Sequence, residues 1–231
     1  MRKWIYTFLV LTLCSCDRNR EFIVFADPWL TDFATATVEA FEKENPDLEC
    51  RVILRSSEVI AQRLSFGEPF DAVLALDAEI FAAKEIEDLS PSFPLAETRV
   101  IRVRKKGALN PGIPRAGGTM MEASDRPLRR ATDKWIAQNT SLLQKDSLFI
   151  ANFQYQAVEY LIHGWVRFGF VPEHLTRLFP GQLELMEQGP GIPGGFHAYT
   201  NTRSAEKGER FTKFLASQKC RQLLADYKII Q

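Results

Sequence analysis

The feature that most constrains the fold is an alternation of short apolar segments with amphipathic ones near the start of the chain. Residues 22–26 (FIVFA), 50–54 (CRVIL) and 71–76 (DAVLAL) are short and rich in β-branched or large apolar residues, as strands are. Between them, apolar residues recur at helical spacing over residues 30–41 and 57–64. The last strand lacks alternation, which is typical of a strand buried on both faces. This order predicts a parallel sheet covered by helices.

The pattern restarts after Pro91 and Pro94. Further strands are predicted at residues 99–103, 148–151, 166–171 and 196–200, and further helices at 127–136, 156–162 and, as two runs, 205–227. Residues 189–195 (GPGIPGG) are predicted to be a flexible connection near a hinge. We therefore expect two α/β lobes with a cleft between them. The first would hold residues 22–92 and 195–231, and the second residues 93–194.

The N-terminus has the form of an export signal. A basic start (Arg2, Lys3) precedes an apolar run too short to span a membrane, and small residues follow. Residues 13–16 (LCSC) resemble the lipobox of bacterial lipoproteins, with Cys16 as the lipidated residue. We expect a signal peptide over residues 1–15, a tether over 16–21, and an extracytoplasmic lipoprotein anchored to a membrane. The alternative is an ordinary secretory signal with incidental cysteines.

Two cysteines remain after the signal, Cys50 and Cys220. In an oxidising compartment they could form one disulfide. The alternative is that both are buried thiols that pack as small apolar side chains.

Composition and motifs exclude several classes of protein. The chain has 29 Lys and Arg against 29 Asp and Glu, whereas nucleic-acid-binding proteins carry a basic excess. His163, His174 and His197 lie far apart and are expected on surfaces or loops rather than as metal ligands. No Gly-x-Ser-x-Gly motif of a hydrolase is present. We expect no enzymatic activity, no metal and no cofactor.

Several segments together resemble the molybdate-binding proteins of ABC transporters. The resemblance is carried by Leu30-Thr31-Asp32, Ser56-Ser57, the stretch Gly67-Glu68-Pro69-Phe70-Asp71, and Asp77. Residues 157–172 resemble the family's helix, glycine and strand of the second lobe, and residues 208–229 resemble its C-terminal helix pair. The resemblance covers most of the mature chain and is weakest over residues 105–145.

The resemblance implies a type II periplasmic binding-protein fold, in which two lobes with mixed sheets close on a small ligand. It also implies a monomer that captures a tetrahedral oxyanion, molybdate or tungstate, and delivers it to an ABC permease. Such a dianion is well held by hydroxyls and by backbone N–H groups at helix N-termini. Ser56 and Ser57 precede a predicted helix and could supply both. The alternative is that they only cap that helix.

Other positions depart from the family's pattern. Trp29, after Asp27 and Pro28, stands where the family has a serine, and Pro172 stands where it often has a tyrosine. Asp27 would repel an anion if it pointed into the cleft. An oxyanion could still be held by Ser57, the Trp29 indole, Gln154 and backbone amides, with Pro28 in the ligand loop. Trp29 could instead stack on an organic solute, or be a core or lobe-closing residue.

The sequence therefore predicts a solute-binding lipoprotein of an ABC importer. The first alternative is a binding protein or sensor of the same fold for a different small solute. The second is a secreted enzyme on this scaffold, which the absence of a nucleophile–base or metal-ligand pattern disfavours.

Overall fold

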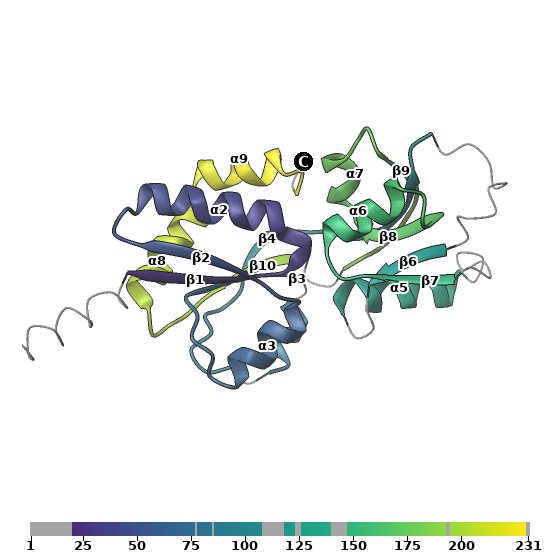
Figure 1. The fold of residues 1–231 in the computed structure, drawn as a ribbon. Helices are drawn as coiled ribbons and strands as arrows, with labels where there is room; N and C mark the ends of the chain where they lie inside the picture. The colour runs from purple at the N-terminus through teal and green to yellow at the C-terminus, as the bar shows by residue number, and fades with distance from the viewer. Residues whose placement is uncertain are drawn as a thin grey trace, which may run out of the picture.

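The computed structural model shows two α/β lobes joined side by side (Figure 1). It describes residues 20–76, 78–84, 86–107, 118–122, 126–139, 147–192 and 195–229. The predicted signal peptide (1–15) and Cys16 lie outside the described residues. None of the helices in these ranges is long and apolar enough to cross a membrane.

The first lobe is built on a mixed sheet with strand order β2-β1-β3-β10-β4. Its strands are β1 (Glu21–Ala26), β2 (Glu49–Leu54), β3 (Ala72–Leu76), β4 (Phe93–Ala96) and β10 (Phe196–Thr200). β1 pairs in parallel with β2 and β3, and β10 is antiparallel to both of its neighbours.

Helices cover both faces of this sheet. On one face lie α2 (Thr31–Glu44), α8 (Ala205–Leu215) and α9 (Gln218–Asp226), and on the other lies α3 (Ser57–Ser65) (Figure 1). The short helix α4 (Ala78–Ala82) is on the same side as α3, because its Phe81 packs in one apolar cluster with Phe25 and Ile60. Phe22, Phe41 and Phe211 pack together beneath the first set, with ring centroids 5.0 to 5.3 Å apart. Phe81 stacks on Tyr199 beneath the second.

The second lobe has a sheet of order β7-β6-β8-β5-β9. Its strands are β5 (Arg99–Lys105), β6 (Gly118–Glu122), β7 (Ser147–Ala151), β8 (Phe168–Pro172) and β9 (Leu183–Gly191). Its helices are α5 (Pro127–Gln138) on one face, and α6 (Gln154–Ile162) and α7 (His174–Leu178) on the other (Figure 1). Trp135 of α5 packs edge-on against Phe170 of β8 at 5.7 Å.

The prediction of two lobes with mixed sheets is confirmed, with differences in detail. The strands β4, β6 and β9 and the short helices α4 and α7 were not predicted. β9 also extends to Gly191, into the segment 189–195 that was expected to be wholly a connection. Because β4 pairs with β10, it belongs to the first lobe. The chain therefore crosses to the second lobe between Ala96 and Arg99, a few residues beyond the expected boundary at 92/93.

The return crossing depends on a glycine. Gly195 has a φ of +64°, and a Cβ on it would lie 2.3 Å from the carbonyl oxygen of Ala96. A side chain there would therefore be strained in its own backbone and would overlap the outgoing crossing. The two crossings touch at this point.

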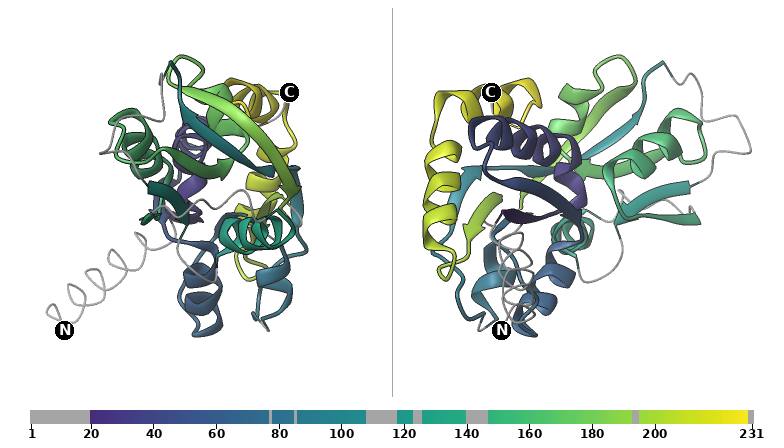
Figure 2. Two further views of the ribbon diagram at one scale, coloured as in Figure 1. Left: turned by 90° about the vertical axis from the view of Figure 1, so that its right-hand side faces the viewer. Right: turned by 60° about the vertical axis from the view of Figure 1, so that its left-hand side comes forward.

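The topology places the carboxyl ends of parallel strands of both lobes at their common boundary. In the first lobe β1, β2 and β3 end there, and in the second β6 and β7 do. The helices that follow these strands begin at the same boundary, as the right-hand view of Figure 2 shows for α2. Ligands of open α/β sheets bind beyond the carboxyl ends of the strands, so a ligand site is expected at this boundary.

Candidate ligand-binding site

The first element of the site is a buried carboxyl group at the start of α3. Asp27 follows β1, is 2% exposed, and its Oδ2 accepts hydrogen bonds from the backbone N–H (3.1 Å) and the hydroxyl (2.7 Å) of Ser57. The Ser57 hydroxyl in turn accepts a bond of 3.2 Å from the backbone N–H of Leu76. The other oxygen of Asp27 accepts from the Trp29 backbone N–H at 3.0 Å, which caps the short 3-10 helix η2 (Pro28–Leu30).

The two predicted serines therefore have different positions. Ser56 occupies the N-cap position of α3, but its side chain makes no capping hydrogen bond. Ser57 is fully buried at the first helical position and gives its N–H and O–H to Asp27. Simple capping thus does not account for Ser57, and an internal carboxyl group holds the donors that were expected to hold a ligand.

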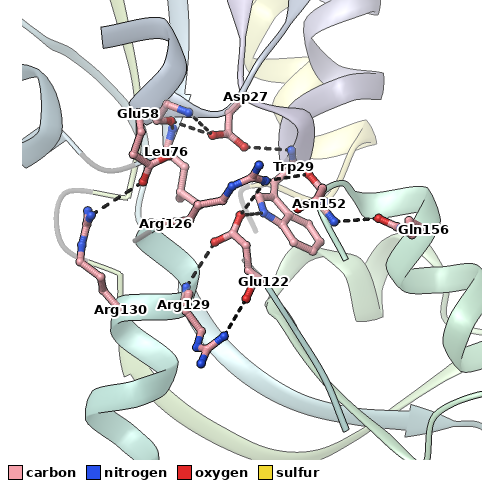
Figure 3. A network of polar contacts seen from close by, with 11 residues as sticks. Asp27, Trp29, Glu58, Leu76, Glu122, Arg126, Arg129, Arg130, Asn152 and Gln156 are labelled. Atoms are coloured by element: carbon pink, nitrogen blue, oxygen red, sulfur yellow. Dashed lines mark hydrogen bonds and ion pairs between the residues drawn. The ribbon is translucent and has the colours of Figure 1, made fainter. Parts of the chain in front are cut away.

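Trp29 joins the two lobes. Its side chain is fully buried, and its Nε1 donates a hydrogen bond of 2.6 Å to Oε1 of Glu122 at the end of β6 (Figure 3). Trp29 thus makes a contact between the lobes, as one alternative for this residue expected, and its contact with a solute stays a prediction. Pro28, also predicted in the site, lies in the same turn, where its carbonyl oxygen accepts from the Thr31 hydroxyl at 2.8 Å.

Glu122 is surrounded by the start of α5. Its Oε2 accepts from the backbone N–H of Arg129 at 3.2 Å, and the Arg126 guanidinium lies 4.0 Å from Oε1. The same guanidinium donates a hydrogen bond to the Asn152 carbonyl oxygen at 3.2 Å. Figure 3 shows it beside a carboxyl group of each lobe, Asp27 and Glu122. Arg130 adds a further contact between the lobes, 3.7 Å from Glu58 of α3.

A second carboxylate joins the lobes at the start of α2. Asp32 accepts from Nε2 of Gln154 at 2.7 Å and from the hydroxyl of Tyr155, both at the start of α6. Gln154 is 1% exposed, so the residue predicted to reach the ligand is buried between the lobes and bound to Asp32.

A histidine completes the contact. His174 was expected on a surface or loop, but it is 3% exposed and its Nε2 lies 3.1 Å from the Trp29 carbonyl oxygen. That prediction is wrong, because α7 packs its first residue against the loop that carries Trp29. Burial lowers the pKa of His174 to about 4, so the ring is neutral at physiological pH.

Burial also shifts the carboxyl groups. It raises the pKa of Glu122 to about 8 and that of Glu58 to about 7, and in both cases the nearby charge of Asp27 adds to the effect. The pKa of Asp27 is itself raised by burial, against hydrogen bonds from Trp29 and Ser57 that favour the ionised form. Removal from water and mutual repulsion both disfavour charge, so this cluster carries fewer negative charges than it has carboxyl groups.

Little empty space remains beside these contacts. A cavity of about 10 Å³ lies between Trp29, Asp32, Gln154 and His174, which is at most the space of one water molecule. A larger hollow of about 620 Å³ lies at the two crossings, lined by Pro94, Thr98, Gly191 and neighbouring residues. We place the candidate site at the boundary between the lobes, where helices of both lobes begin, because the buried polar groups converge there. A solute would enter it only when the lobes separate.

Sequence reasoning missed Glu58, Glu122 and Arg126. Glu122 lies on β6, within residues 105–145, where the family resemblance is weakest. No sequence pattern linked it to Trp29, 93 residues earlier. Asp27 was noted only as a residue that would repel an anion, and its position supports that concern.

Cys50 on β2 and Cys220 on α9 are free thiols in this structure, so the disulfide is not formed in it. Within the described residues, no group of three or more His, Cys, Asp or Glu could hold a metal ion.

Comparison with known proteins identifies the fold. No protein-family model and no curated protein sequence matches this chain. Among solved structures, the periplasmic molybdate-binding protein of Azotobacter vinelandii is similar with a TM-score of 0.71 and 15% identity, over 89% of this chain and 97% of that one. The regulatory domain of HypT from Salmonella typhimurium gives 0.66 and 16%, over 90% and 96%.

A third neighbour binds a ligand in its structure. The regulatory domain of CcmR from Synechocystis, in complex with 2-PG, has a TM-score of 0.64 and 11% identity, over 85% of this chain and 96% of that one. Identities this low establish the fold and do not choose between a transport protein and a regulatory domain. The chain has the type II periplasmic-binding-protein-like fold, with its candidate site where the two lobes meet.

Proposed function

We propose that this protein is an extracytoplasmic solute-binding lipoprotein whose two lobes close on a small polar solute. The observation that carries the proposal is that buried polar side chains from both lobes meet beyond the carboxyl ends of parallel strands. Asp27, Trp29 and Ser57 come from one lobe, and Glu122 and Gln154 come from the other. A ligand shifts the equilibrium of a two-lobe protein toward the closed state to the extent that it binds the closed state more tightly than the open one.

The location and partners belong to the same proposal. The basic start, the apolar run and the Cys16 lipobox support export and lipid anchoring, and an ABC permease in the membrane would receive the solute. The unmodified chain in a bacterial host would then incorporate labelled palmitate, and a Cys16→Ala variant would not. Equal labelling of the two proteins, or no labelling of the unmodified chain, would argue against a lipid anchor at Cys16.

The sequence resemblance favours molybdate or tungstate, and one structural neighbour is a molybdate-binding protein. Against these two anions stands the fact that both Ser57 donors expected to hold them are bonded to Asp27. A second candidate function is a sensor of the same fold for a different solute, which the similarity to regulatory domains supports equally. ATP hydrolysis by a reconstituted permease would separate the two. Stimulation by the solute-loaded protein indicates transport, and no stimulation favours sensing.

The proposal is tested by screening solutes against the full chain in detergent. Oxyanions, amino acids, amines and sugar acids would be compared by the thermal midpoint, which a ligand of the native state raises, and by tryptophan emission. Because Trp29 is buried between the lobes, we expect the true ligand to raise the midpoint and change the emission. The emission change should be lost in Trp29→Phe and kept in Trp165→Phe, which alters an exposed tryptophan. If no solute changes either readout, the proposal is wrong.

A further inference from the structure

We infer that Asp27 is a specificity-determining residue that excludes free tetrahedral oxyanions by occupying, from within the chain, the anion position at the start of α3. The inference rests on the proposed function, since it concerns which solutes the site accepts. It assigns to Asp27 a role opposite to that of a ligand-binding serine.

Both hydrogen-bond donors of Ser57 are used within the chain. This residue has two donors, its N–H and its O–H, and both point to Oδ2 of Asp27, at 3.1 and 2.7 Å. Its hydroxyl oxygen accepts from the backbone N–H of Leu76 at 3.2 Å. The hydroxyl proton is therefore directed at Asp27, and neither donor of Ser57 is left for a solute.

The carboxyl group of Asp27 lies where a bound anion would lie. The start of α3, a helix of nine residues, carries partial positive charge and favours a negative group. Asp27 supplies that group, and it is held in place from two sides. Its own backbone N–H donates to the Leu74 carbonyl oxygen at 2.8 Å, and its Oδ1 caps Trp29 at 3.0 Å.

Two further carboxyl groups surround the position of the Asp27 carboxyl group. Glu58 and Glu122 face Asp27 from α3 and β6, and the charge of Asp27 raises the pKa of both. Arg126 faces the same cluster and opposes these shifts. A dianion entering here would meet three carboxyl groups and would have to displace one of them from Ser57. Removal of Asp27 alone would free both Ser57 donors and remove the nearest negative charge.

The test compares four proteins: the unmodified chain, Asp27→Ser, Asp27→Ser with Ser57→Ala, and Glu58→Gln. Serine is a good cap, so Asp27→Ser keeps an acceptor for Trp29 while it removes the carboxyl group. Glu58→Gln is the matched control, because it removes an ionisable carboxyl group from the same helix start and leaves Asp27 on Ser57. Sulfate, phosphate, molybdate and tungstate are titrated by calorimetry, with the thermal midpoint as a second readout.

We expect Asp27→Ser to gain saturable one-to-one binding of at least one of these anions, at least tenfold tighter than the unmodified chain. The gain should be lost when Ser57→Ala is added and should be absent in Glu58→Gln. Two results overturn the inference. One is a folded Asp27→Ser protein that gains no binding, and the other is an unmodified chain that binds an anion through Ser57. If Asp27→Ser does not fold, Asp27→Asn, which keeps the cap, is expected to show a weaker gain under the same criteria.

The result can be separated from the proposed function. If the solute screen finds a ligand but Asp27→Ser gains no anion binding, the solute-binding function stands and the role of Asp27 fails. If no solute binds the unmodified chain but the variant gains an anion, the role of Asp27 stands and the screen counts against the function.

Discussion

The indole Nε1 of Trp29 in the first lobe donates a hydrogen bond of 2.6 Å to Oε1 of Glu122 in the second lobe. Both side chains are buried, at 0% and 3% exposure. A ligand in the cleft of a two-lobe protein ordinarily supplies such bridging contacts, and here the chain supplies them itself. A solute must therefore open or replace this contact, so ligand affinity will depend on the free energy of the Trp29–Glu122 pair.

Trp29→Phe removes the indole donor and keeps an aromatic ring. A hydrogen bond to a buried acidic group contributes about 1–3 kcal/mol, and each kcal/mol lowers the midpoint of a chain this size by about 2–4 °C. We expect a lower thermal midpoint and a larger radius of gyration in X-ray scattering, because the lobes separate more often. Trp165→Phe, at a side chain 52% exposed, is the control and should change neither. An unchanged radius in Trp29→Phe would show that the pair does not hold the lobes together.

The same pair shows what sequence could and could not predict. Most strands and helices were predictable, because apolar periodicity reflects burial within a single element. The site was only partly predictable, because it depends on which element ends face each other. Ser57 was placed at a helix start by pattern and Gln154 near one by the family resemblance, whereas Glu122 lies on β6, a short strand of five residues without alternation. Asp27 was visible in the sequence, but the fact that it accepts both donors of Ser57 is a property of the folded loop.

Gly195→Ala tests the crossing between the lobes. Alanine at a φ of +64° costs about 1–2 kcal/mol, and its Cβ would also meet the Ala96 carbonyl oxygen at 2.3 Å. We expect a drop in the thermal midpoint of at least several degrees. Gly181→Ala is the matched control, because a Cβ there has nothing within 4 Å and its φ is not in the left-handed region. Equal midpoints for the two variants would mean that the crossing tolerates a side chain.

The thiol state of Cys50 and Cys220 can be measured directly. The structure holds both as free thiols, and burial raises the pKa of Cys50 to about 12 and that of Cys220 to about 11. Because the thiolate is the reactive form, a disulfide reagent should react slowly with the two thiols of the native protein. In denaturant both thiols should react rapidly and completely. The measurement uses a Cys14→Ala, Cys16→Ala background, and adding Cys220→Ser should leave one reactive thiol. Absence of reactive thiols in unreduced, denatured protein would instead show a disulfide.

The stability of the protein should fall as pH rises from about 6.5 to about 8. Glu122 has a pKa of about 8 in the folded protein against an ordinary value of 4.5, and Glu58 has one of about 7. Between the unfolded and folded pKa values the folded state binds more protons, so raising the pH favours unfolding. One such group changes the free energy of unfolding by at most about 1.4 kcal/mol per pH unit.

His174 has the opposite effect in a different window. Its folded pKa of about 4 lies below the ordinary 6.5, so stability is lost as pH falls from about 6.5 to about 4, where only the unfolded state takes up the proton. The range between pH 6.5 and 8 therefore isolates the carboxyl groups. Chemical unfolding at several pH values in this range is the measurement.

Glu122→Gln should flatten this dependence, because glutamine does not titrate and its amide oxygen can still accept from Trp29. We expect the variant to lose less stability than the unmodified chain between pH 6.5 and 8. Some stability would be lost at all pH values, since Oε2 of Glu122 also accepts from Arg129. Glu184→Gln is the control, because the Arg104 hydrogen bond lowers the pKa of that exposed carboxylate, which is ionised throughout the range. If the free energy of unfolding of Glu122→Gln falls with pH as steeply as that of the unmodified chain, Glu122 is not the group whose protonation is linked to folding.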